Sequence, residues 1–444
     1  MSSRRYEQPA AIWEALSHPE EAEPLEKDIV LLSLNWLIAH ASQDGAALCR
    51  RQDLPPAAHL SVESLRVIFD SGRSNALPIV SISYCWLAPE HPDANGTQLR
   101  RVALVLQHWR DAKGKGYRAL GFTDMGVFWD WGSLHQRHGG GRTAAQDAAF
   151  RRALTTTMDL WYAHRKVTKI FVTELPSGFD GPGYEQRGWP YFERSCAELI
   201  TPQYMGGRYW PMCIDLREGT SGRGRLLPRT PDAFADGLAA RAFTNEADGG
   251  TVAELYTKAA TTILGEARIL NYGRLGRAPS SGVSIFAAAA ARGATLAAAL
   301  RMAPKLRYLY LYGMQLKEDE TAALFDGLPQ GALPELRLLD LLDNELKPMA
   351  ARALAAAITR GAMPALARVF VGTRFGAGPR ALRRELGTQR PAHLQIGGQL
   401  AAAWQFRHGI LKSARLALRI PVPIERMATN HRSFDDQWNR EDDD

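Results

Sequence analysis

Three segments of the chain repeat at a fixed interval, and this regularity constrains the fold more than any other feature. The segments PKLRYLYLYGMQL, PELRLLDLLDNEL and PALARVFVGTRFG begin at positions 304, 334 and 364. An Ala-rich stretch of helical character follows the first two. A constant period of about 30 residues is typical of solenoids, in which each unit of one strand and one helix buries its apolar face against its neighbours.

The apolar positions inside the repeated segments follow the pattern LxxLxLxx(N)xL. The first segment supplies Leu306, Leu309, Leu311 and Leu316, and the second supplies Leu336, Leu339, Leu341, Asn344 and Leu346. This pattern resembles the longer leucine-rich repeats typified by ribonuclease inhibitor, over about residues 284–390. Met314 and Arg374 replace the asparagine, and Gly376 replaces the last leucine of the third segment. The third unit is therefore expected to be a terminal cap.

The side chains that alternate with the buried leucines are predicted to face the concave side of such a solenoid, because successive side chains of a strand point to opposite faces. They are Tyr308, Tyr310, Tyr312, Leu338, Asp340, Arg368 and Phe370. An aromatic, partly charged face has the composition of a protein-binding surface, so a protein partner is predicted there. The alternative is that the tyrosines line a short curve that binds nothing.

Upstream of the repeats, short apolar runs alternate with amphipathic helices, the pattern of a parallel sheet covered by helices. The predicted strands are 77–84, 125–131, 167–175 and 208–216. The fold class is α/β with a C-terminal solenoid. The predicted organisation is a helical N-terminal extension (1–74), an α/β domain (75–218), a linker with connecting helices (219–283), the repeats (284–390) and a C-terminal extension with an acidic tail (391–444).

Four segments of the α/β domain are similar, in order, to TIR and HET domains. VSISYCW (80–86) resembles the first strand of TIR domains and the SYxW of HET domains, and VFWDWGSLHQ (127–136) resembles a HET segment with a central aspartate. RALTTTMDLWYAH (152–164) occupies the place of the next helix, and RGWPYFERSCAEL (187–199) has a glutamate four residues after a tryptophan. TIR domains share this last feature, and the glutamate is catalytic in members that cleave NAD.

The resemblance covers most of the predicted α/β domain and implies a TIR-like parallel sheet, a module able to self-associate, and Glu193 as the candidate catalytic residue. NAD would be a substrate and not a bound cofactor. A single carboxylate suits this cleavage because nicotinamide leaves as a neutral molecule, so that Glu193 has only to stabilise an oxocarbenium-like centre. The connections APEHPDANGTQ and RHGGGRTAAQ are longer than the family pattern, so the substrate loops are not carried over.

The side chain of Glu193 is also predicted to point inward from its helix, residues 189–200. Steps of 100° place it in one stripe with Trp189, Phe192, Cys196 and Ile200, and place Glu198 on the opposite face. An inward carboxylate is either paired or located at a cleft. Two interpretations stay open, a catalytic carboxylate and a buried ion pair with Arg187 or Arg142.

Residues at the carboxyl ends of the strands are predicted to border the same cleft, where ligands of open α/β sheets sit. These candidate substrate-binding residues are Tyr84, Trp86, Asp130, Ser133, His135, Arg142 and Trp189. Arg142 and the glycines before it would accommodate a diphosphate, although a surface loop without a ligand is the simpler interpretation, because no P-loop or GxGxxG is present. His135 and His138 lack a third ligand, so no metal is predicted, and Cys85 is expected to be a core residue.

Composition excludes several classes of protein. The four cysteines form no CxxC pair, which favours a reducing compartment such as the cytoplasm. The start of the chain lacks the pattern of a secretory signal, and the longest apolar stretch, 29–41, is too short for a membrane and is predicted to be a buried helix. The net charge of +7 is spread over scattered arginines, so no nucleic acid is expected. A signalling enzyme and a non-catalytic scaffold remain the two candidate functions.

Overall fold

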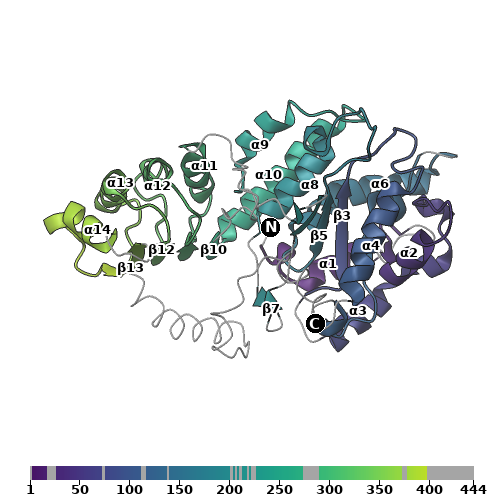
Figure 1. Ribbon diagram of the computed structural model, residues 1–444, viewed down its shortest axis with the longest axis horizontal. Coiled ribbons are helices and arrows are strands. Elements are labelled where there is room, and N and C mark those ends of the chain that lie inside the picture. Colours follow the sequence, from purple (N-terminus) through teal and green to yellow (C-terminus); the bar gives the residue numbers. More distant parts are fainter. Residues whose placement is uncertain are drawn as a thin grey trace. The chain divides into compact units, whose positions relative to one another are not determined.

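The protein is a mixed α/β chain with parallel sheets flanked by helices, shown as a computed structural model in Figure 1. The structure describes residues 3–17, 27–72, 76–111, 117–137, 140–200, 204–205, 208–209, 213–217, 220–221, 227–273, 290–372 and 378–397. Its contacts divide the chain into unit 1, residues 1–222 and 231–259, and unit 2, residues 223–230 and 260–444. Within the described ranges, no helix has the length and apolar character needed to cross a bilayer.

The sheet of unit 1 has seven strands in the order β2-β1-β4-β3-β5-β8-β9. Its four central strands are parallel: β3 (Ile79–Tyr84), β4 (Gly126–Phe128), β5 (Thr168–Val172) and β8 (Cys213–Arg217). The short β9 (Thr220–Ser221) pairs antiparallel with β8 at one edge. Counted along the chain, the central strands lie in the order 2-1-3-4, which is that of a common class of doubly wound sheet. The switch point of such a sheet lies between its first and third strands, here β3 and β5.

The N-terminal region, predicted as a helical extension over 1–74, contributes strands to this sheet. Strand β1 (Leu31–Ser33) pairs antiparallel with β4 and with β2 (His59–Leu60). The stretch 29–41, predicted as one helix, is therefore a strand followed by α2 (Leu34–Ala41). The side chain of Ser33 accepts a hydrogen bond from the Trp36 backbone N–H at 3.1 Å and caps this helix. The remaining N-terminal helices are η1 (Ser3–Tyr6), α1 (Pro9–Leu16), η2 (Arg51–Asp53), η3 (Pro56–Ala58) and α3 (Val62–Ser71).

Helices cover the faces of the central strands. Helix α4 (Thr97–Asp111) connects β3 to β4 and packs against α2, whereas α7 (Met158–Ala163) packs against α8 (Gly188–Glu198), which also contacts β3. A capping box between Thr143 and Gln146 starts α6 (Ala144–Thr156). Beyond the sheet, the ring of Phe234 on α9 (Pro231–Leu238) stacks between Tyr191 on α8 and Tyr256 on α10 (Asp248–Glu266), at centroid distances of 5.0 and 3.9 Å.

Two predicted strands of unit 1 differ from those observed. The strand predicted over 125–131 ends at Phe128, because Asp130 begins the short helix α5 (Asp130–Ser133) and accepts the backbone N–H of Trp131 at 2.6 Å. The strand predicted over 208–216 joins the parallel sheet only from Cys213. Its first residues form β7 (Arg208–Tyr209), which pairs with β6 (Tyr204–Met205) in a separate hairpin.

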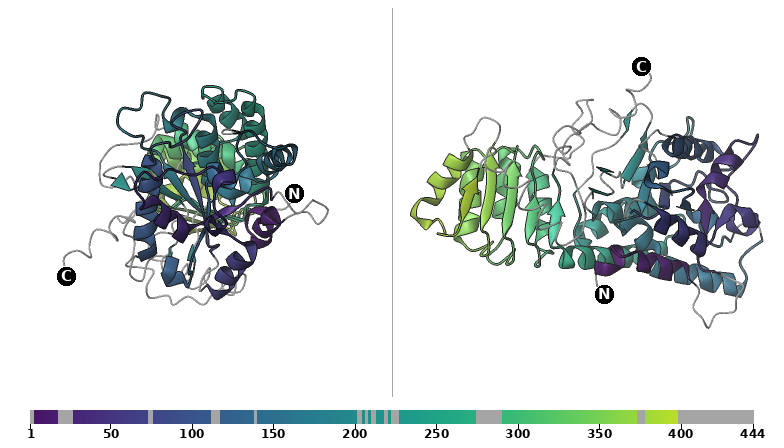
Figure 2. Two further views of the ribbon diagram at one scale, coloured as in Figure 1. Left: turned by 90° about the vertical axis from the view of Figure 1, so that its right-hand side faces the viewer. Right: turned by 90° about the horizontal axis from the view of Figure 1, so that it is seen from below.

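The sheet of unit 2 contains five parallel strands that follow one another in chain order, as the green and yellow strands in Figure 2 show. They are β10 (Ile269–Asn271), β11 (Tyr308–Tyr310), β12 (Leu338–Leu342), β13 (Arg368–Gly372) and β14 (Gln395–Gly397). Tyr308, Leu338 and Arg368 lie in register, so these neighbouring strands are offset by one period of the sequence repeat. Because β10 and β14 belong to it, the sheet extends beyond the predicted range 284–390 at both ends.

Helices α11 (Ala290–Leu300), α12 (Glu318–Asp326), α13 (Pro348–Thr359) and α14 (Gly378–Leu386) pack in sequence beside this sheet. A Cβ atom at Gly293 would stand 1.9 Å from the carbonyl oxygen of Glu320, so the close approach of α11 to α12 requires glycine. Gly313 and Asp343, one period apart, share left-handed backbone with φ of 61° and 57°. These two successive repeats of unit 2 therefore have the same turn conformation after their strands.

Asn344, the asparagine of the repeat pattern, joins adjacent units of the repeat. Its side-chain amide donates to the carbonyl oxygens of Leu311 at 2.7 Å and Leu341 at 3.2 Å, and its oxygen accepts the N–H of Leu316 at 3.0 Å. The side chain is buried, so these bonds satisfy backbone groups that water does not reach. Arg374, the equivalent position in the third segment, lies outside the described residues.

Candidate functional site

Glu193 lies on α8 with its side chain turned toward β3, and only 6% of the residue is exposed. The hydroxyl of Ser83 on β3 donates a hydrogen bond to its carboxyl group, and Ser83 in turn shares a hydrogen bond with the hydroxyl of Tyr184. Tyr162 on α7 also hydrogen-bonds Glu193 and donates to the carbonyl oxygen of Ile82 at 3.0 Å. The predicted inward orientation of Glu193 agrees with this burial.

Burial raises the pKa of Glu193 well above its usual range, and the charge of Asp130 raises it further. Hydrogen bonds from Ser83 and Tyr162 lower this pKa but do not offset the loss of solvent. Burial thus favours the protonated, neutral form of this carboxyl group. A neutral group cannot stabilise a positive centre by its charge, so a catalytic role would require Glu193 to be brought into contact with solvent or a ligand and ionised.

The predicted alternative, a buried ion pair with Arg187 or Arg142, is wrong for the described residues. Arg187 donates instead to the carbonyl oxygens of Pro182 at 3.1 Å and Trp86 at 3.2 Å. Arg142 pairs with Asp147. Burial without a counter-charge among the described residues explains why the pKa of Glu193 is raised.

Glu198, predicted to lie on the face of α8 opposite Glu193, is buried as well. Its carboxylate pairs with Arg194 at 3.2 Å, and Arg194 also approaches Glu185 at 3.7 Å. All of α8 except Trp189 is buried, so the helix has no solvent face that a helical projection could have identified. One helix thus carries two buried glutamates, one neutral and one ion-paired.

A second cluster surrounds Asp130 at the carboxyl ends of β3 and β4. The carboxylate accepts the hydroxyl of Tyr84 at 2.7 Å and the indole N–H of Trp86 at 3.1 Å. The Trp86 ring meets that of Trp131 edge to face, with centroids 5.2 Å apart. Three predicted substrate-binding residues, Tyr84, Trp86 and Asp130, are therefore brought together. Burial raises the pKa of Asp130, although these hydrogen bonds lower it.

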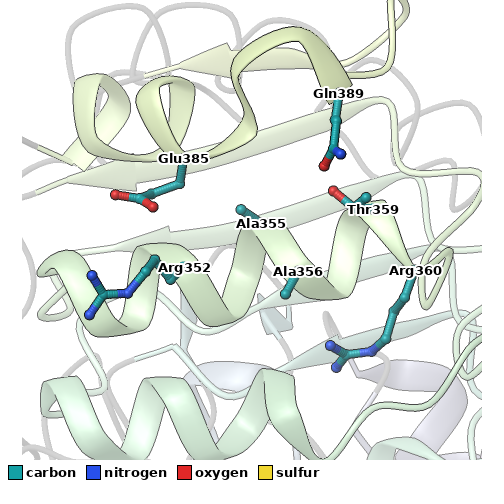
Figure 3. A pocket seen from close by; sticks show the side chains of 7 residues that line it. All are labelled: Arg352, Ala355, Ala356, Thr359, Arg360, Glu385 and Gln389. Carbon is teal, nitrogen blue, oxygen red and sulfur yellow. The ribbon is translucent and has the colours of Figure 1, made fainter.

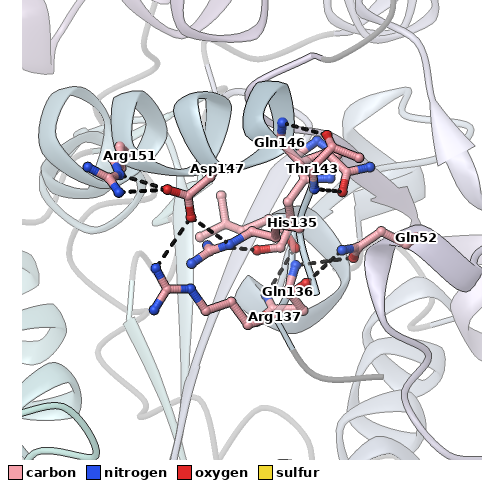
Figure 4. Close-up of polar contacts among 10 residues, drawn as sticks. Gln52, His135, Gln136, Arg137, Thr143, Gln146, Asp147 and Arg151 are labelled. Carbon is pink, nitrogen blue, oxygen red and sulfur yellow. Dashed lines mark hydrogen bonds and ion pairs between the residues drawn. The ribbon is translucent and has the colours of Figure 1, made fainter. Parts of the chain in front are cut away.

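Ser133, His135 and Arg142, predicted to line the cleft, hold the loop after β4 together. The hydroxyl of Ser133 accepts the backbone N–H of Trp129 at 3.0 Å. Burial lowers the pKa of His135 to about 3, so its imidazole is neutral. Arg142 pairs with Asp147 at 3.2 Å and donates to the carbonyl oxygen of His135 at 3.3 Å, in the network of which Figure 4 shows part. These contacts engage Arg142 within the loop, and a diphosphate at this position stays a prediction.

The other predicted residues have definite neighbours. The half-buried Trp189 donates its indole N–H to Asp248 at 2.9 Å, at the start of α10. Cys85 is a core residue, and burial raises the pKa of its thiol to about 12. His138 lies outside the described residues. The partners of Glu193 were not predicted, although Ser83 had a signal in the sequence, as one of two serines on a fully buried strand.

The residues predicted to bind a partner gather on one face of the unit 2 sheet, which we call the tyrosine face: Tyr308, Tyr310, Tyr312, Leu338, Asp340, Arg368 and Phe370. Tyr310, Asp340 and Phe370 form one row in register across three strands. Tyr310, Leu338 and Phe370 pack in an apolar cluster with the partly buried Tyr308 and Tyr312 at its margin. Arg368 is exposed. The aromatic part of the face is thus a packed cluster, and Arg368 is exposed beside it.

A shallow groove of about 420 Å³ lies between α13 and α14 (Figure 3). It is lined by Arg352, Ala355, Ala356, Thr359, Arg360, Glu385 and Gln389. Arg360 is engaged in the fold, because it donates to the carbonyl oxygens of Leu328, at 2.9 Å, and Phe325 at the end of α12. Arg360 therefore serves the packing of the helices at this groove.

No known protein family model matches this chain, and no curated protein matches it. A proposal for function consequently depends on the residues and contacts described above.

Proposed function

We propose that this chain is a two-part signalling or sensing protein, in which unit 2 is a leucine-rich-repeat solenoid that binds a protein partner and unit 1 is a TIR/HET-like module. The constant offset between β11, β12 and β13 and the bonds of Asn344 across the repeat support the first assignment. The 2-1-3-4 order of the central strands of unit 1 supports the second. Four cysteines without a disulfide support action in the cytoplasm.

The observation that carries the proposal is the composition of the tyrosine face. Rigid aromatic side chains give large contact area at little cost in conformational entropy, and they dominate protein-binding hot spots. The exposed Arg368 and the half-buried Tyr308 are the members that a partner would reach first. In this role unit 1 acts as a scaffold that self-associates or binds a further protein.

Hydrolysis of NAD by unit 1 is the second candidate, and one observation favours it. Glu193 is hydrogen-bonded to Ser83 near the carboxyl end of β3, next to the switch point between β3 and β5, where doubly wound sheets bind ligands. Catalysis would require a rearrangement that exposes and ionises Glu193, for example on clustering of the module. The burial of this group, which raises its pKa, supports the scaffold as the resting function.

The binding role is tested by affinity capture with the full chain, comparing wild type with the double variant Tyr308→Ala, Arg368→Ala. Both positions are accessible, so the substitutions should leave the apolar cluster folded. Met349→Ala, an exposed apolar residue on α13 away from the strands, is the matched control. We expect a partner that the control retains and the double variant loses. Equal capture by all three proteins would contradict the proposal.

The enzymatic candidate is tested by nicotinamide release from NAD at low and high protein concentration. Turnover that rises with concentration and is lost in Glu193→Gln would establish the module as an enzyme. A wild-type protein without turnover under both conditions would leave the scaffold role alone.

A further inference from the structure

Asp340 occupies the centre of the tyrosine face. On β12 it lies in register with Tyr310 on β11 and Phe370 on β13, so aromatic residues flank it on both sides. Only 4% of the residue is exposed. Its carboxylate accepts the backbone N–H of Leu342 at 3.0 Å. No lysine, arginine or histidine among the described residues forms an ion pair with it.

A carboxylate in this position is costly for the free protein. Transfer of an ionised carboxylate from water to an apolar environment is unfavourable unless a cation or several hydrogen bonds compensate it. At Glu193, burial raises the pKa and so favours the protonated form. Burial raises the pKa of Asp340 to about 6, so at pH 7.5 the group is still mostly ionised. The negative charge is therefore retained within an aromatic surface.

We propose that Asp340 and its aromatic neighbours bind the side chain of a lysine or arginine that the protein partner inserts into the tyrosine face. A cation at this point would neutralise the carboxylate and could lie over the ring faces of Tyr310 and Phe370, which attract positive charge through their π systems. This inference deepens the proposed partner-binding function and depends on it.

The other charged and titratable side chains near Asp340 fit this chemistry. Tyr308, Tyr310 and Tyr312 come from β11 and the turn after it, and burial raises the pKa of Tyr310. Asp343, which follows β12, adds a second negative charge close to Asp340. Arg368 on β13 lies in register with Leu338 and is exposed. Asp340 is thus the buried charge of the face, and Asp343 the exposed one.

The probe for this site is a pair of capped peptides, Ac-(Gly-Arg)3-NH2 and the same peptide with citrulline in place of arginine. Citrulline keeps the shape of arginine and removes its charge. Binding to the full chain is measured by fluorescence anisotropy of labelled peptides at pH 7.5. We expect the arginine peptide to bind at least ~10-fold more tightly than the citrulline peptide.

Asp340→Asn should reduce the affinity for the arginine peptide by ~10-fold or more, since it removes the charge and keeps the shape. Asp343→Asn is the matched control. It removes the same charge at an exposed position, and asparagine tolerates the left-handed backbone there, so the loss should stay within ~2-fold. Asp340→Asn relieves a buried charge, so the variant should stay folded, which urea unfolding checks.

The pH dependence gives an independent readout. Binding needs the ionised carboxylate, so affinity in the wild type should fall as the pH drops from 8 through about 6, and Asp340→Asn should show no such dependence. Equal losses in the Asp340 and Asp343 variants would show non-specific attraction and overturn the proposal. Equal affinity for the arginine peptide and the citrulline peptide would also overturn the proposal. So would self-association of the free chain, if Asp340→Asn abolishes it.

The result also separates this inference from the function on which it depends. If Tyr308→Ala, Arg368→Ala abolishes partner capture but the arginine peptide does not bind, the face is a binding surface and the cation site is wrong. If partner capture is unaffected by the double variant, the proposed function fails first.

Discussion

Replacement of Glu193 by glutamine should stabilise unit 1 at neutral pH, and the stabilisation should grow as the pH rises. Glutamine has the shape of the protonated side chain and can keep the contacts to Ser83 and Tyr162. The wild-type group must hold a proton that the unfolded chain releases. Glu193 is the catalytic candidate because of the resemblance to TIR domains. Its replacement by glutamine would then increase the stability of the fold.

The magnitude follows from proton linkage. The carboxyl of Glu193 ionises near pH 4.3 in the unfolded chain and at a higher pH in the folded protein. Stability from this group is fully present below about pH 4.3 and is lost as the pH rises toward the folded pKa, by up to ~1.4 kcal/mol per pH unit. The variant should therefore gain stability relative to wild type as the pH rises above about 5.

Urea unfolding followed by tryptophan fluorescence at several pH values measures this difference. Of the 11 tryptophans, all except Trp404 and Trp438 precede position 211, so the signal reports mainly on unit 1. Glu198→Gln is the control on the same helix. It removes the partner of the buried Arg194 and should destabilise by about 2–3 kcal/mol, with Glu185 compensating in part. A difference between wild type and Glu193→Gln that stays constant from pH 5 to pH 8 would refute the assignment of a neutral Glu193.

Two further substitutions test contacts that hold each unit together. Asn344→Ala should lower the stability of unit 2 by about 3 kcal/mol, because buried backbone groups of Leu311 and Leu316 lose their partners; far-UV circular dichroism during urea unfolding measures this, and a loss below about 1 kcal/mol would contradict it. Asp159→Asn should cost about 2 kcal/mol and release the start of the chain, because Asp159 accepts the Tyr6 hydroxyl at 2.6 Å and pairs with Arg5 at 3.2 Å. Unchanged hydrogen exchange in residues 3–6 would count against the second prediction.

The central strands that are buried on both faces have nearly continuous apolar sequences, so the sequence predicted their positions well. Strand β3 was predicted from position 77 and begins at Ile79, and β5 was predicted from 167 and begins at Thr168. The constant spacing of the repeated segments likewise anticipated which residues of β11, β12 and β13 lie in register, because each strand of such an array pairs with the next.

Features set by distant parts of the chain were missed. Strand β1 is short and is a strand because it pairs with β4, which lies far along the chain. Asp130 falls inside a predicted strand, whereas its carboxylate accepts the hydroxyl of Tyr84 and the residue starts a helical turn. The protonation of Glu193 depends on its contact with Ser83, on a distant strand, and on burial without a cation, which helical spacing cannot reveal.

The two sheets differ in the sequence distance between paired strands, and this difference sets the order in which a nascent chain can complete them. In unit 2 each strand from β11 to β13 finds its neighbour one repeat period later, so loop closure is short and assembly can proceed as synthesis advances. In unit 1 Arg5 pairs with Asp159, and Asp159 pairs in turn with Lys258, so these contacts join widely separated parts of the chain. During translation, unit 1 must therefore remain partly open until Lys258 has left the ribosome. Over that interval its apolar core is most exposed to aggregation and chaperone binding.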